Sequence, residues 1–191
     1  MQQIDYDIII IGGGINGAGI ARDLGYQNNY RVCLIEQSDF ASATSSNSSK
    51  LAHGGLRYLE QGHFKLIYQA CHERQLLYQQ APHLVKEIPF VYPIYSHSKR
   101  PKWQVNIGLT IYDWLSGKHR GTPHYMISKD EVVDYHPHLN KESLIGGAVY
   151  YDGQMNDSRL VIESLLDASS VLNPKPLLSI PHIISTETAS P

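Results

Sequence analysis

The chain of 191 residues is 42% hydrophobic, 9% aromatic and 18% charged, which suits a globular protein of one or two domains, and it has no apolar run approaching the roughly 20 residues of a membrane-spanning helix. Sixteen basic residues against eighteen acidic ones give a formal net charge of −2, which argues against nucleic acid as a partner. Two cysteines without a CxxC motif, after a start that lacks a secretory signal pattern, predict a reducing, cytoplasmic location.

The first forty residues alternate between strand and helix patterns around a glycine-rich turn. Residues 7–11 form a continuous β-branched run, which is typical of a strand that a parallel sheet buries on both faces. Three consecutive glycines follow, then a helix-compatible stretch at 18–24, turn residues, and a second apolar run at 31–35. This order predicts a βαβ unit of about thirty residues.

The remaining elements are predicted from shorter patterns. A serine-rich run at 42–50 favours, on composition alone, a flexible loop over a binding site. Apolar spacing predicts three amphipathic helices, and Ser128-Lys129-Asp130-Glu131 suggests a short capped helix. Two strands are also expected, the first of which contains prolines and is an edge strand or an extended loop. These elements are expected at 64–80, 102–115 and 157–168 for the helices, from Ser128 for the capped helix, and at 88–95 and 146–151 for the strands. From residue 171, four prolines in 21 residues predict an irregular tail.

The predicted helix at 102–115 carries an apolar face. Trp103, Ile107, Ile111 and Trp114 recur at helical spacing, and basic residues flank the helix at both ends. Two interpretations remain open. The face either packs in a protein core or lies on a membrane surface, where tryptophan and basic flanks are favoured.

The glycine turn has the spacing of a dinucleotide-binding motif. Gly12 permits the tight turn, Gly14 lets a diphosphate approach the backbone, and Gly17 lets the helix pack on the strand. The diphosphate is expected at the helix N-terminus, where free N–H groups stabilise negative charge. Glu36 lies 19 residues after Gly17, where a carboxylate would bind a ribose diol and repel a 2′-phosphate. The motif alone leaves FAD and NAD open, although the absence of a Cys-x4-Cys pair excludes a flavin disulfide reductase.

Further motifs resemble one enzyme family. The glycine turn, the serine-rich block Ala43–Leu51 and the segment His53-Gly54-Gly55-Leu56-Arg57-Tyr58-Leu59-Glu60 are similar to those of the FAD-dependent glycerol-3-phosphate dehydrogenases. The likeness extends over residues 5–168 and includes shorter matches. These are Glu73-Arg74, Ala81-Pro82-His83-Leu84, Gly108-Leu109, Tyr112-Asp113, Tyr151-Asp152, Asp157 and Arg159.

The resemblance implies FAD as the cofactor and assigns site residues. Arg57 would bind the substrate phosphate bidentately, with Tyr58 lining the same pocket; a surface ion pair is the alternative role for this arginine. His53 would lie near the isoalloxazine ring, unless it is a hydrogen-bonded structural histidine. The full set of implied cofactor contacts is Gly12, Gly14, Ile15, Asn16, Gly17, Glu36, Gln37, Thr44, Ser45, Ser48, Ser49, Lys50 and His53.

The fold implied is α/β, with a Rossmann-like FAD-binding domain of the glutathione-reductase-like type and an inserted cap domain, incomplete in this chain. Residues 1–75 would begin the FAD-binding domain, 76–148 would begin the cap or substrate domain, and 149–170 would return to the FAD-binding domain. Residues 171–191 would be an irregular, aberrant tail. No HExxH motif or Cys/His cluster predicts a metal site, and His136-Pro137-His138 is interpreted as a surface turn.

The implied reaction is oxidation of sn-glycerol 3-phosphate to dihydroxyacetone phosphate, with electrons passed to a quinone. The catalytic base is expected beyond the chain end, because members of the family are much longer. Two alternatives stay open: a glycerol-3-phosphate oxidase that uses oxygen, and a truncated, non-catalytic nucleotide-binding fragment. A quinone-linked role also implies peripheral membrane contact on the cytoplasmic face of the inner membrane, and a homodimer in the full-length form.

Overall fold

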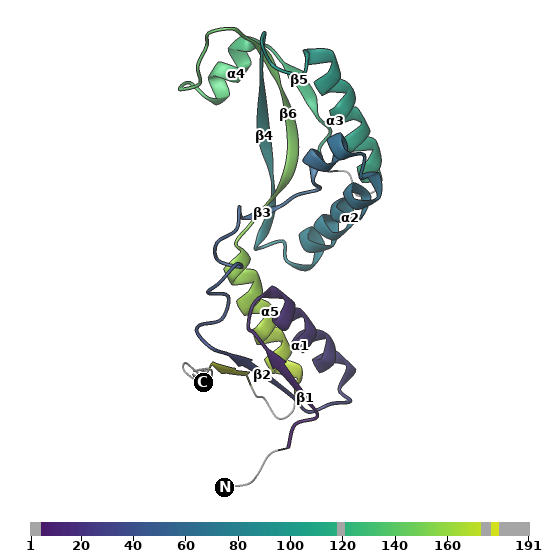
Figure 1. Cartoon of the computed structure of the whole chain (residues 1–191), viewed down its shortest axis with the longest axis vertical. Helices are drawn as coiled ribbons and strands as arrows, with labels where there is room; N and C mark the ends of the chain where they lie inside the picture. Colours follow the sequence, from purple (N-terminus) through teal and green to yellow (C-terminus); the bar gives the residue numbers. More distant parts are fainter. Residues whose placement is uncertain (1–4, 118–120, 173–176, 180–191) are drawn as a thin grey trace, which may run out of the picture. The chain divides into compact units, whose positions relative to one another are not determined.

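The chain forms two compact units. The computed structural model describes residues 5–117, 121–172 and 177–179. One unit comprises 1–50 and 156–191, and the other comprises 51–155 (Figure 1). These divisions fall after residues 50 and 155, whereas the sequence places domain boundaries after 75 and 148. The difference arises because residues 51–52 pair with the last strand of the second unit, and the helix at 64–80 packs there too.

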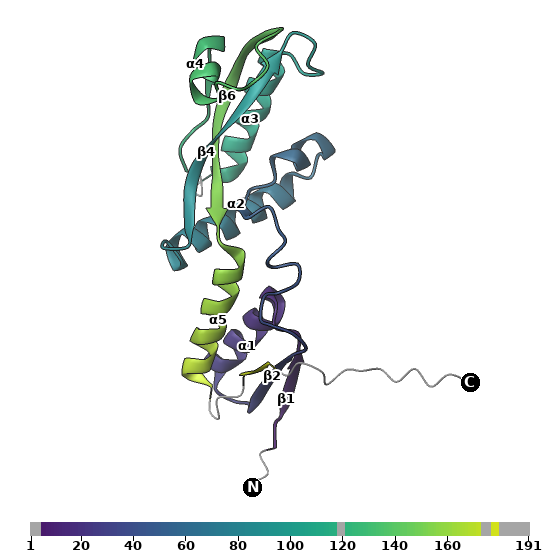
Figure 2. The ribbon, with the colours of Figure 1, turned by 90° about the vertical axis from the view of Figure 1, so that its left-hand side faces the viewer.

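The first unit contains the predicted βαβ arrangement. Strands β1 (Ile8–Ile11) and β2 (Val32–Glu36) are parallel, with Ile8 opposite Val32 and Ile11 opposite Ile35. Helix α1 (Ile15–Gln27) connects them, and α5 (Asp157–Val171) packs beside it (Figure 2). The sequence therefore predicted the type and order of these elements correctly.

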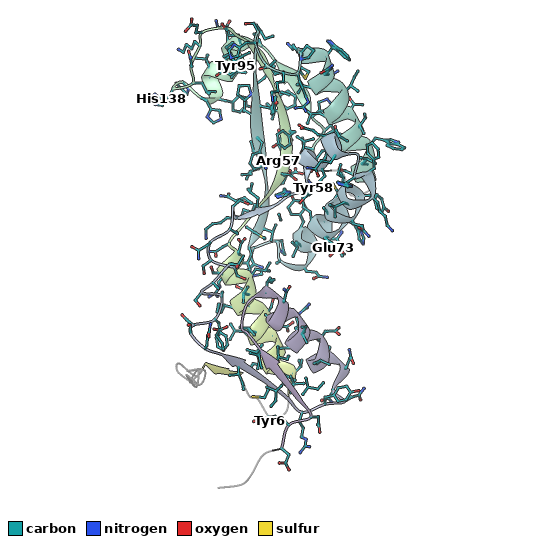
Figure 3. The ribbon with its side chains drawn as sticks, in the orientation of Figure 1. Tyr6, Arg57, Tyr58, Glu73, Tyr95 and His138 are labelled. Atoms are coloured by element: carbon teal, nitrogen blue, oxygen red, sulfur yellow. The ribbon has the colours of Figure 1, made fainter. Side chains whose placement is uncertain are left out.

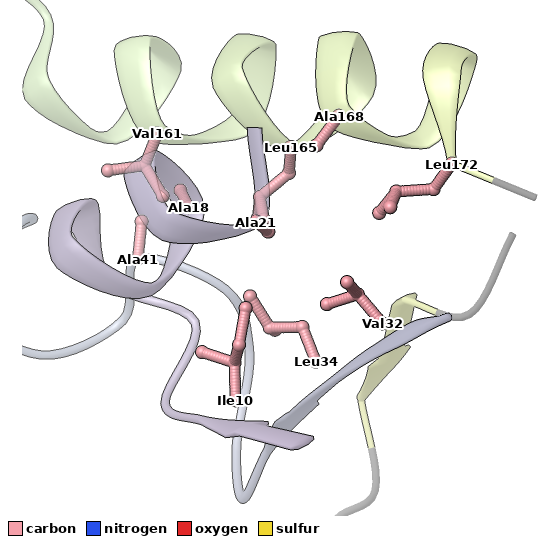
Figure 4. Packing of buried hydrophobic residues seen from close by; sticks show 10 residues of the cluster. All are labelled: Ile10, Ala18, Ala21, Val32, Leu34, Ala41, Val161, Leu165, Ala168 and Leu172. Carbon is pink, nitrogen blue, oxygen red and sulfur yellow. The ribbon is translucent and has the colours of Figure 1, made fainter. Parts of the chain in front are cut away.

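Small residues allow the two helices of this unit to approach closely. Ala18 and Ala21 of α1 are fully buried against Val161, Leu165 and Ala168 of α5 (Figure 4). Apolar side chains from the sheet complete the core, namely Ile10, Val32 and Leu34. Full burial of each valine or leucine here contributes roughly 1.5–3 kcal/mol.

The expectation that the first strand is buried on both faces is wrong. Ile10 is buried, but Ile9 is 58% exposed and Ile11 is 77% exposed. The helices cover one face of β1, and no residue in the described part of the chain covers the other. Alternate side chains of a strand point to opposite faces, so one face stays open.

The expectation of a tail without regular structure is also wrong for three residues. Strand β7 (Leu177–Ser179) pairs in parallel with β2, placing Leu34 opposite Leu177 and Glu36 opposite Ser179. The pairing is sterically allowed because Pro176 and Pro181 flank this strand and do not interrupt it. Residues 173–176 and 180–191 lie outside the described residues.

The second unit is built on a long antiparallel pair. Strand β4 (Val85–Tyr95) pairs along its whole length with β6 (Leu144–Met155). The other edge of β6 pairs with β3 (Leu51–Ala52) and β5 (Tyr125–Ile127), so β4 is an edge strand of this sheet. That position accounts for its two prolines, which lack the N–H that a second neighbour would need.

Helices cover both faces of this pair. Ala148 of β6 packs with Val105 and Leu109 of α3 (Lys102–Ser116), whereas the next residue, Val149, packs with Val132 of α4 (Lys129–Tyr135). Figure 1 shows α4 on the side opposite α2 (Phe64–Gln80) and α3. The remaining element is the 3-10 helix η1 (Leu56–Gln61), and α4 begins with a Ser128–Glu131 capping box.

The apolar face of α3 that the sequence singled out does not pack in a core. Trp103 is 62% exposed, Trp114 is 78% exposed and Ile107 is also exposed, while Val105 and Leu109 are buried on the opposite side. The interpretation as a core-packed face is therefore wrong within this chain. Among the described helices, none is both long and apolar enough to span a bilayer.

Candidate functional site: a nucleotide-binding turn and an exposed arginine

The glycine turn between β1 and α1 has the backbone geometry that its motif predicts. Gly12 adopts a φ of +106°, which side chains disfavour, and its N–H donates to the Ile35 carbonyl at 2.8 Å. A Cβ atom built on Gly17 would overlap the carbonyl oxygen of Gly12. Glycine is therefore needed at both positions, once for conformation and once for close approach.

The serine-rich loop reaches the N-terminus of α1. The N–H of Ile15, the first helical residue, donates to Oγ of Ser45 at 3.3 Å. Gly14, the N-cap residue, has no side chain that could make this bond. The hydroxyl of the predicted contact Ser45 thus lies at the N-terminus of α1, where backbone amides outside the helical hydrogen-bond pattern bind anions.

Other residues of the loop divide into anchors and exposed groups. Ser46 is an anchor, because its hydroxyl hydrogen-bonds the Ala41 carbonyl and lies 2.9 Å from Oγ of Ser158 on α5. The Lys50 N–H donates to Oγ of Ser48 at 2.9 Å. The exposed predicted contacts of this unit are Ile15, Asn16, Gln37, Thr44, Ser48, Ser49 and Lys50.

Glu36 is held at the end of β2 facing the turn. Its Oε2 accepts the N–H of Gly13 at 2.6 Å, and its Oε1 accepts the N–H of Ser38 at 2.9 Å. These backbone hydrogen bonds hold the pKa of Glu36 below its usual value. The side chain is therefore charged at neutral pH and retains acceptor capacity for hydroxyl groups.

These residues fit the adenosine-diphosphate half of a dinucleotide. The turn offers helix N-terminal amides to a diphosphate, and Glu36 offers an acceptor to a ribose diol at the end of the second strand. The fit rests on the Gly12 conformation, the Ser45 contact and the ionised carboxylate, all within one unit.

The predicted substrate residues belong to the second unit (Figure 3). Arg57, on η1, is exposed, and its guanidinium has no ion pair or hydrogen bond with any described residue. Tyr58 is half-buried and packs against Ile67 and Tyr112 of the core. The side chain of His53 is exposed, just before the turn into η1. The alternative role of Arg57, a surface ion pair, thus finds no partner in the described ranges.

One carboxylate without a predicted role is buried near the serine-rich loop. Asp157, at the start of α5, is 7% exposed, and its Oδ1 has no hydrogen-bond partner among the described residues. Burial raises the pKa of Asp157, and the charge of Lys50 opposes this shift. In the sequence, Asp157 was singled out only as one of the short matches to the family. Elsewhere, His136 and His138 are exposed, and the described residues include no group of three ligands able to hold a metal ion.

The model of one family, FAD dependent oxidoreductase, matches residues 7–170. The chain belongs to this family. The match includes all of the unit 51–155, together with residues 7–50 and 156–170 of the other unit. Their α/β fold agrees with the predicted fold class.

Several named relatives within this family are similar to the chain. The chain is 43% identical over 169 residues to the glycerol-3-phosphate dehydrogenase of Synechocystis, covering 88% of this chain and 30% of the relative. It is 41% identical over 173 residues to the alpha-glycerophosphate oxidase of Streptococcus pneumoniae, covering 88% and 28%. The glycerol-3-phosphate dehydrogenase from Bacillus halodurans, solved in complex with FAD, matches with a TM-score of 0.63 and 28% identity, covering 95% and 27%. The chain thus spans less than a third of the length of these relatives.

Proposed function

We propose that this chain carries the nucleotide-binding turn and the substrate-phosphate residue of an FAD-dependent enzyme that oxidises sn-glycerol 3-phosphate to dihydroxyacetone phosphate. The observation that carries the proposal is the exposed Arg57, which has no ion-pair partner among the described residues. Two relatives that match most of this chain, at 43% and 41% identity, are named for this substrate.

The first unit would hold FAD. The N-terminal amides of α1 stabilise the diphosphate, Glu36 accepts ribose hydroxyls, and Ser45 contributes a hydroxyl beside the turn. The other proposed contacts between Gly14 and Lys50 are exposed or half-buried, except Gly17, which is buried against the Gly12 carbonyl and supports the turn. When bound, the flavin supplies the hydride acceptor. NADP is disfavoured, because the Glu36 carboxylate would repel a 2′-phosphate.

The second unit would bind the substrate phosphate. The planar guanidinium of Arg57 donates two parallel N–H bonds to phosphate oxygens, which fixes the orientation as well as the charge. Tyr58 borders this site, and His53 is proposed as a neighbour of the flavin ring. We assign the proton-accepting base to none of the described residues.

The electron acceptor is proposed to be a membrane quinone. The exposed α3 face of Trp103, Ile107 and Trp114, with Lys99 and Lys102 beside it, suits peripheral contact with a bilayer, here the cytoplasmic face of the inner membrane. The oxidase among the relatives makes oxygen the competing acceptor.

The test places residues 5–170 in the Synechocystis relative in place of its matching stretch. Arg57→Lys in this chimera is expected to raise the KM for glycerol 3-phosphate at least about tenfold with unchanged flavin content, because lysine keeps the charge but loses the fork. Arg100→Lys is the matched control, since Arg100 already pairs with Glu60 at 2.8 Å.

Three outcomes would contradict the proposal. An unchanged KM for Arg57→Lys rejects the phosphate assignment. A colourless chimera that binds NADH rejects FAD. A flavin-loaded chimera without glycerol 3-phosphate oxidation, when the parent relative is active, favours the non-catalytic nucleotide-binding alternative.

A further inference from the structure

Three buried polar side chains from three separate elements meet inside the second unit. Arg74 of α2, Tyr112 of α3 and Asp152 of β6 are 4%, 2% and 4% exposed. The Arg74 guanidinium forms an ion pair with Asp152, and its Nη1 also donates to the Tyr112 hydroxyl at 3.2 Å. That hydroxyl in turn donates to Oδ1 of Asp152 at 3.1 Å. We call these three residues the Asp152 cluster.

The cluster contacts the backbone that leads to Arg57. The Gly54 N–H donates to Oδ1 of Asp152 at 3.1 Å, across 98 positions of sequence. A Cβ atom built on Gly54 would overlap both the Tyr112 hydroxyl and the sulfur of Cys71, so the chain passes in direct contact with the cluster. Gly54 follows His53 immediately and precedes Arg57 by three residues.

The position of Gly54 determines where η1, the helix that carries Arg57, begins. Gly55 adopts a φ of +75°, and its carbonyl accepts the N–H of Tyr58 at 2.8 Å, which forms the first turn. Fixing Gly54 therefore fixes the direction in which η1 begins. Arg57 is the second residue of that helix.

Tyr112 and Arg74 both keep the protons that their hydrogen bonds in the cluster require. Burial raises the pKa of Tyr112, as does the Asp152 charge, so its hydroxyl keeps the proton that it donates. Burial alone would lower the pKa of Arg74. The interactions with Tyr112 and Asp152 outweigh burial, so the net pKa of Arg74 lies above its ordinary value and the guanidinium stays charged.

A stabilising role alone explains the cluster poorly. A buried ion pair gains little over well-packed apolar residues of similar size, because desolvation offsets the attraction. Two buried polar atoms, Nε of Arg74 within the cluster and the hydroxyl of nearby Tyr78, also lack a partner among the described residues. What apolar residues would not provide is a charged acceptor for the Gly54 amide.

We propose that Arg74, Tyr112 and Asp152 are positioning residues for substrate binding: Asp152 holds the Gly54 amide, and thereby fixes the backbone that carries His53 and Arg57. The inference rests on the proposed role of Arg57. A bidentate arginine needs a preorganised backbone, because small displacements lose one of its two bonds.

Two matched double variants in the chimera separate positioning from stability. Arg74→Met with Asp152→Leu removes both charges and the acceptor for Gly54. Arg74→Gln with Asp152→Asn removes both charges but leaves an amide oxygen for Gly54. We expect the first variant to raise the KM for glycerol 3-phosphate about tenfold and the second by less than about threefold, both with full flavin content.

A double-mutant cycle supplies the readout that a structural role would not change. If the cluster acts through Arg57, Arg57→Lys adds little to the KM in the Met/Leu background, although it raises the KM strongly in the parent. Hydrogen exchange of the 54–56 amides in the 191-residue chain is expected to accelerate in the Met/Leu variant and not in the Gln/Asn variant.

The control lies on the same helix. Asp113, next to Tyr112, accepts hydrogen bonds from the His124 N–H at 3.1 Å and contacts its Nδ1 at 2.7 Å, away from Gly54. Asp113→Asn is expected to leave the KM unchanged. If the Met/Leu variant does not fold, Tyr112→Phe replaces it, with an expected KM increase of about threefold that vanishes in the Arg57→Lys background.

An unchanged KM in the folded Met/Leu variant, or in its Tyr112→Phe replacement, overturns the inference. So does an increase that adds in full to that of Arg57→Lys. When Arg57→Lys raises the KM but the cluster variants do not, the inference fails and the proposed function stands. When Arg57→Lys itself has no effect, the proposed function fails.

Discussion

The Gly13 N–H donates a hydrogen bond to Oε2 of Glu36 at 2.6 Å, which joins the glycine turn to the end of β2 across 23 positions of sequence. The second carboxylate oxygen accepts the Ser38 N–H, so Glu36 is fixed on both sides. One residue therefore shapes the turn and presents a negative acceptor beside it. This double role makes Glu36 the most sensitive test of the nucleotide site.

Replacing Glu36 with glutamine should weaken FAD binding by about 1.5–3 kcal/mol, the value of hydrogen bonds to a charged partner. The amide keeps the size of the side chain but loses the charge that strengthens bonds to ribose hydroxyls. Titration calorimetry on the chimera measures the loss. Asp39→Asn, in the exposed loop after β2, is the control and should leave the affinity unchanged. Equal FAD affinities for the parent chimera, Glu36→Gln and Asp39→Asn would show that Glu36 does not contribute to FAD binding.

The contact between α1 and α5 should make stability depend on pH in the acid range. The Arg22 guanidinium donates to Asp167 and lowers the pKa of this carboxyl below its ordinary value of 3.8, with help from Tyr26. Because the unfolded chain binds the proton more tightly, the contribution is complete above about pH 4 and disappears as pH falls through the lower, folded-state pKa.

Melting temperatures of the chain between pH 2 and pH 7 check this dependence. Asp167→Asn and Arg22→Gln should each lower the melting temperature at pH 7 and flatten its decline in acid. Because both side chains are about 35–43% exposed, solvent screening keeps the effect within about 1 kcal/mol. Two variants with the parent's full acid slope would show that this ion pair contributes nothing.

Two glycines of α1 should respond in opposite directions to alanine. Gly17→Ala places a methyl group against the Gly12 carbonyl and should destabilise the first unit by about 1–3 kcal/mol, with loss of FAD affinity. Gly19 is exposed, and its added Cβ meets no atom within 4 Å. Gly19→Ala should therefore stabilise the helix by about 0.5–1 kcal/mol. Urea denaturation and FAD titration measure both, and equal effects would contradict the close-packing argument.

The exposed tryptophans of α3 should govern binding to lipid vesicles. Trp103→Ala with Trp114→Ala is expected to reduce flotation of the chain with anionic liposomes more than about tenfold, because interfacial binding scales with buried apolar area. Added salt should weaken the parent's binding as it screens Lys99 and Lys102.

Leu66→Ala is the control for the membrane prediction. Leu66 is 43% exposed on α2 and lies outside the α3 face. Its substitution should leave flotation unchanged. Undiminished flotation of the tryptophan variant would instead show that α3 is covered by protein and does not contact lipid.

The sequence predicted what depends on neighbours along the chain. The bounds of α2 were predicted residue for residue, because apolar spacing defines its interior and Pro82 follows its end. The Ser128–Glu131 box located α4, since its two hydrogen bonds span only three residues. The turn with Gly12 and Gly17 was also predicted from local sequence, because its glycines are required by the conformation and contacts of the turn itself.

Only the tertiary structure decided which surfaces meet. Periodicity identified the tryptophan face of α3, but the helix buries the other side, where Val105 and Leu109 fit Ala148. The prolines that flank Leu177–Ser179 in sequence argued against a strand there, and only the structure shows that β7 pairs with the edge of β2.

The site shows the same division. Spacing located Glu36 and the glycine turn, whereas the hydrogen bond from Gly54 to Asp152 joins residues 98 positions apart. Arg74 lies among apolar residues on the buried face of α2; the family match Glu73-Arg74 singled it out but predicted no partner for it. No local pattern encodes such a partner, because a buried charge is stabilised only by groups that folding brings to it from other elements.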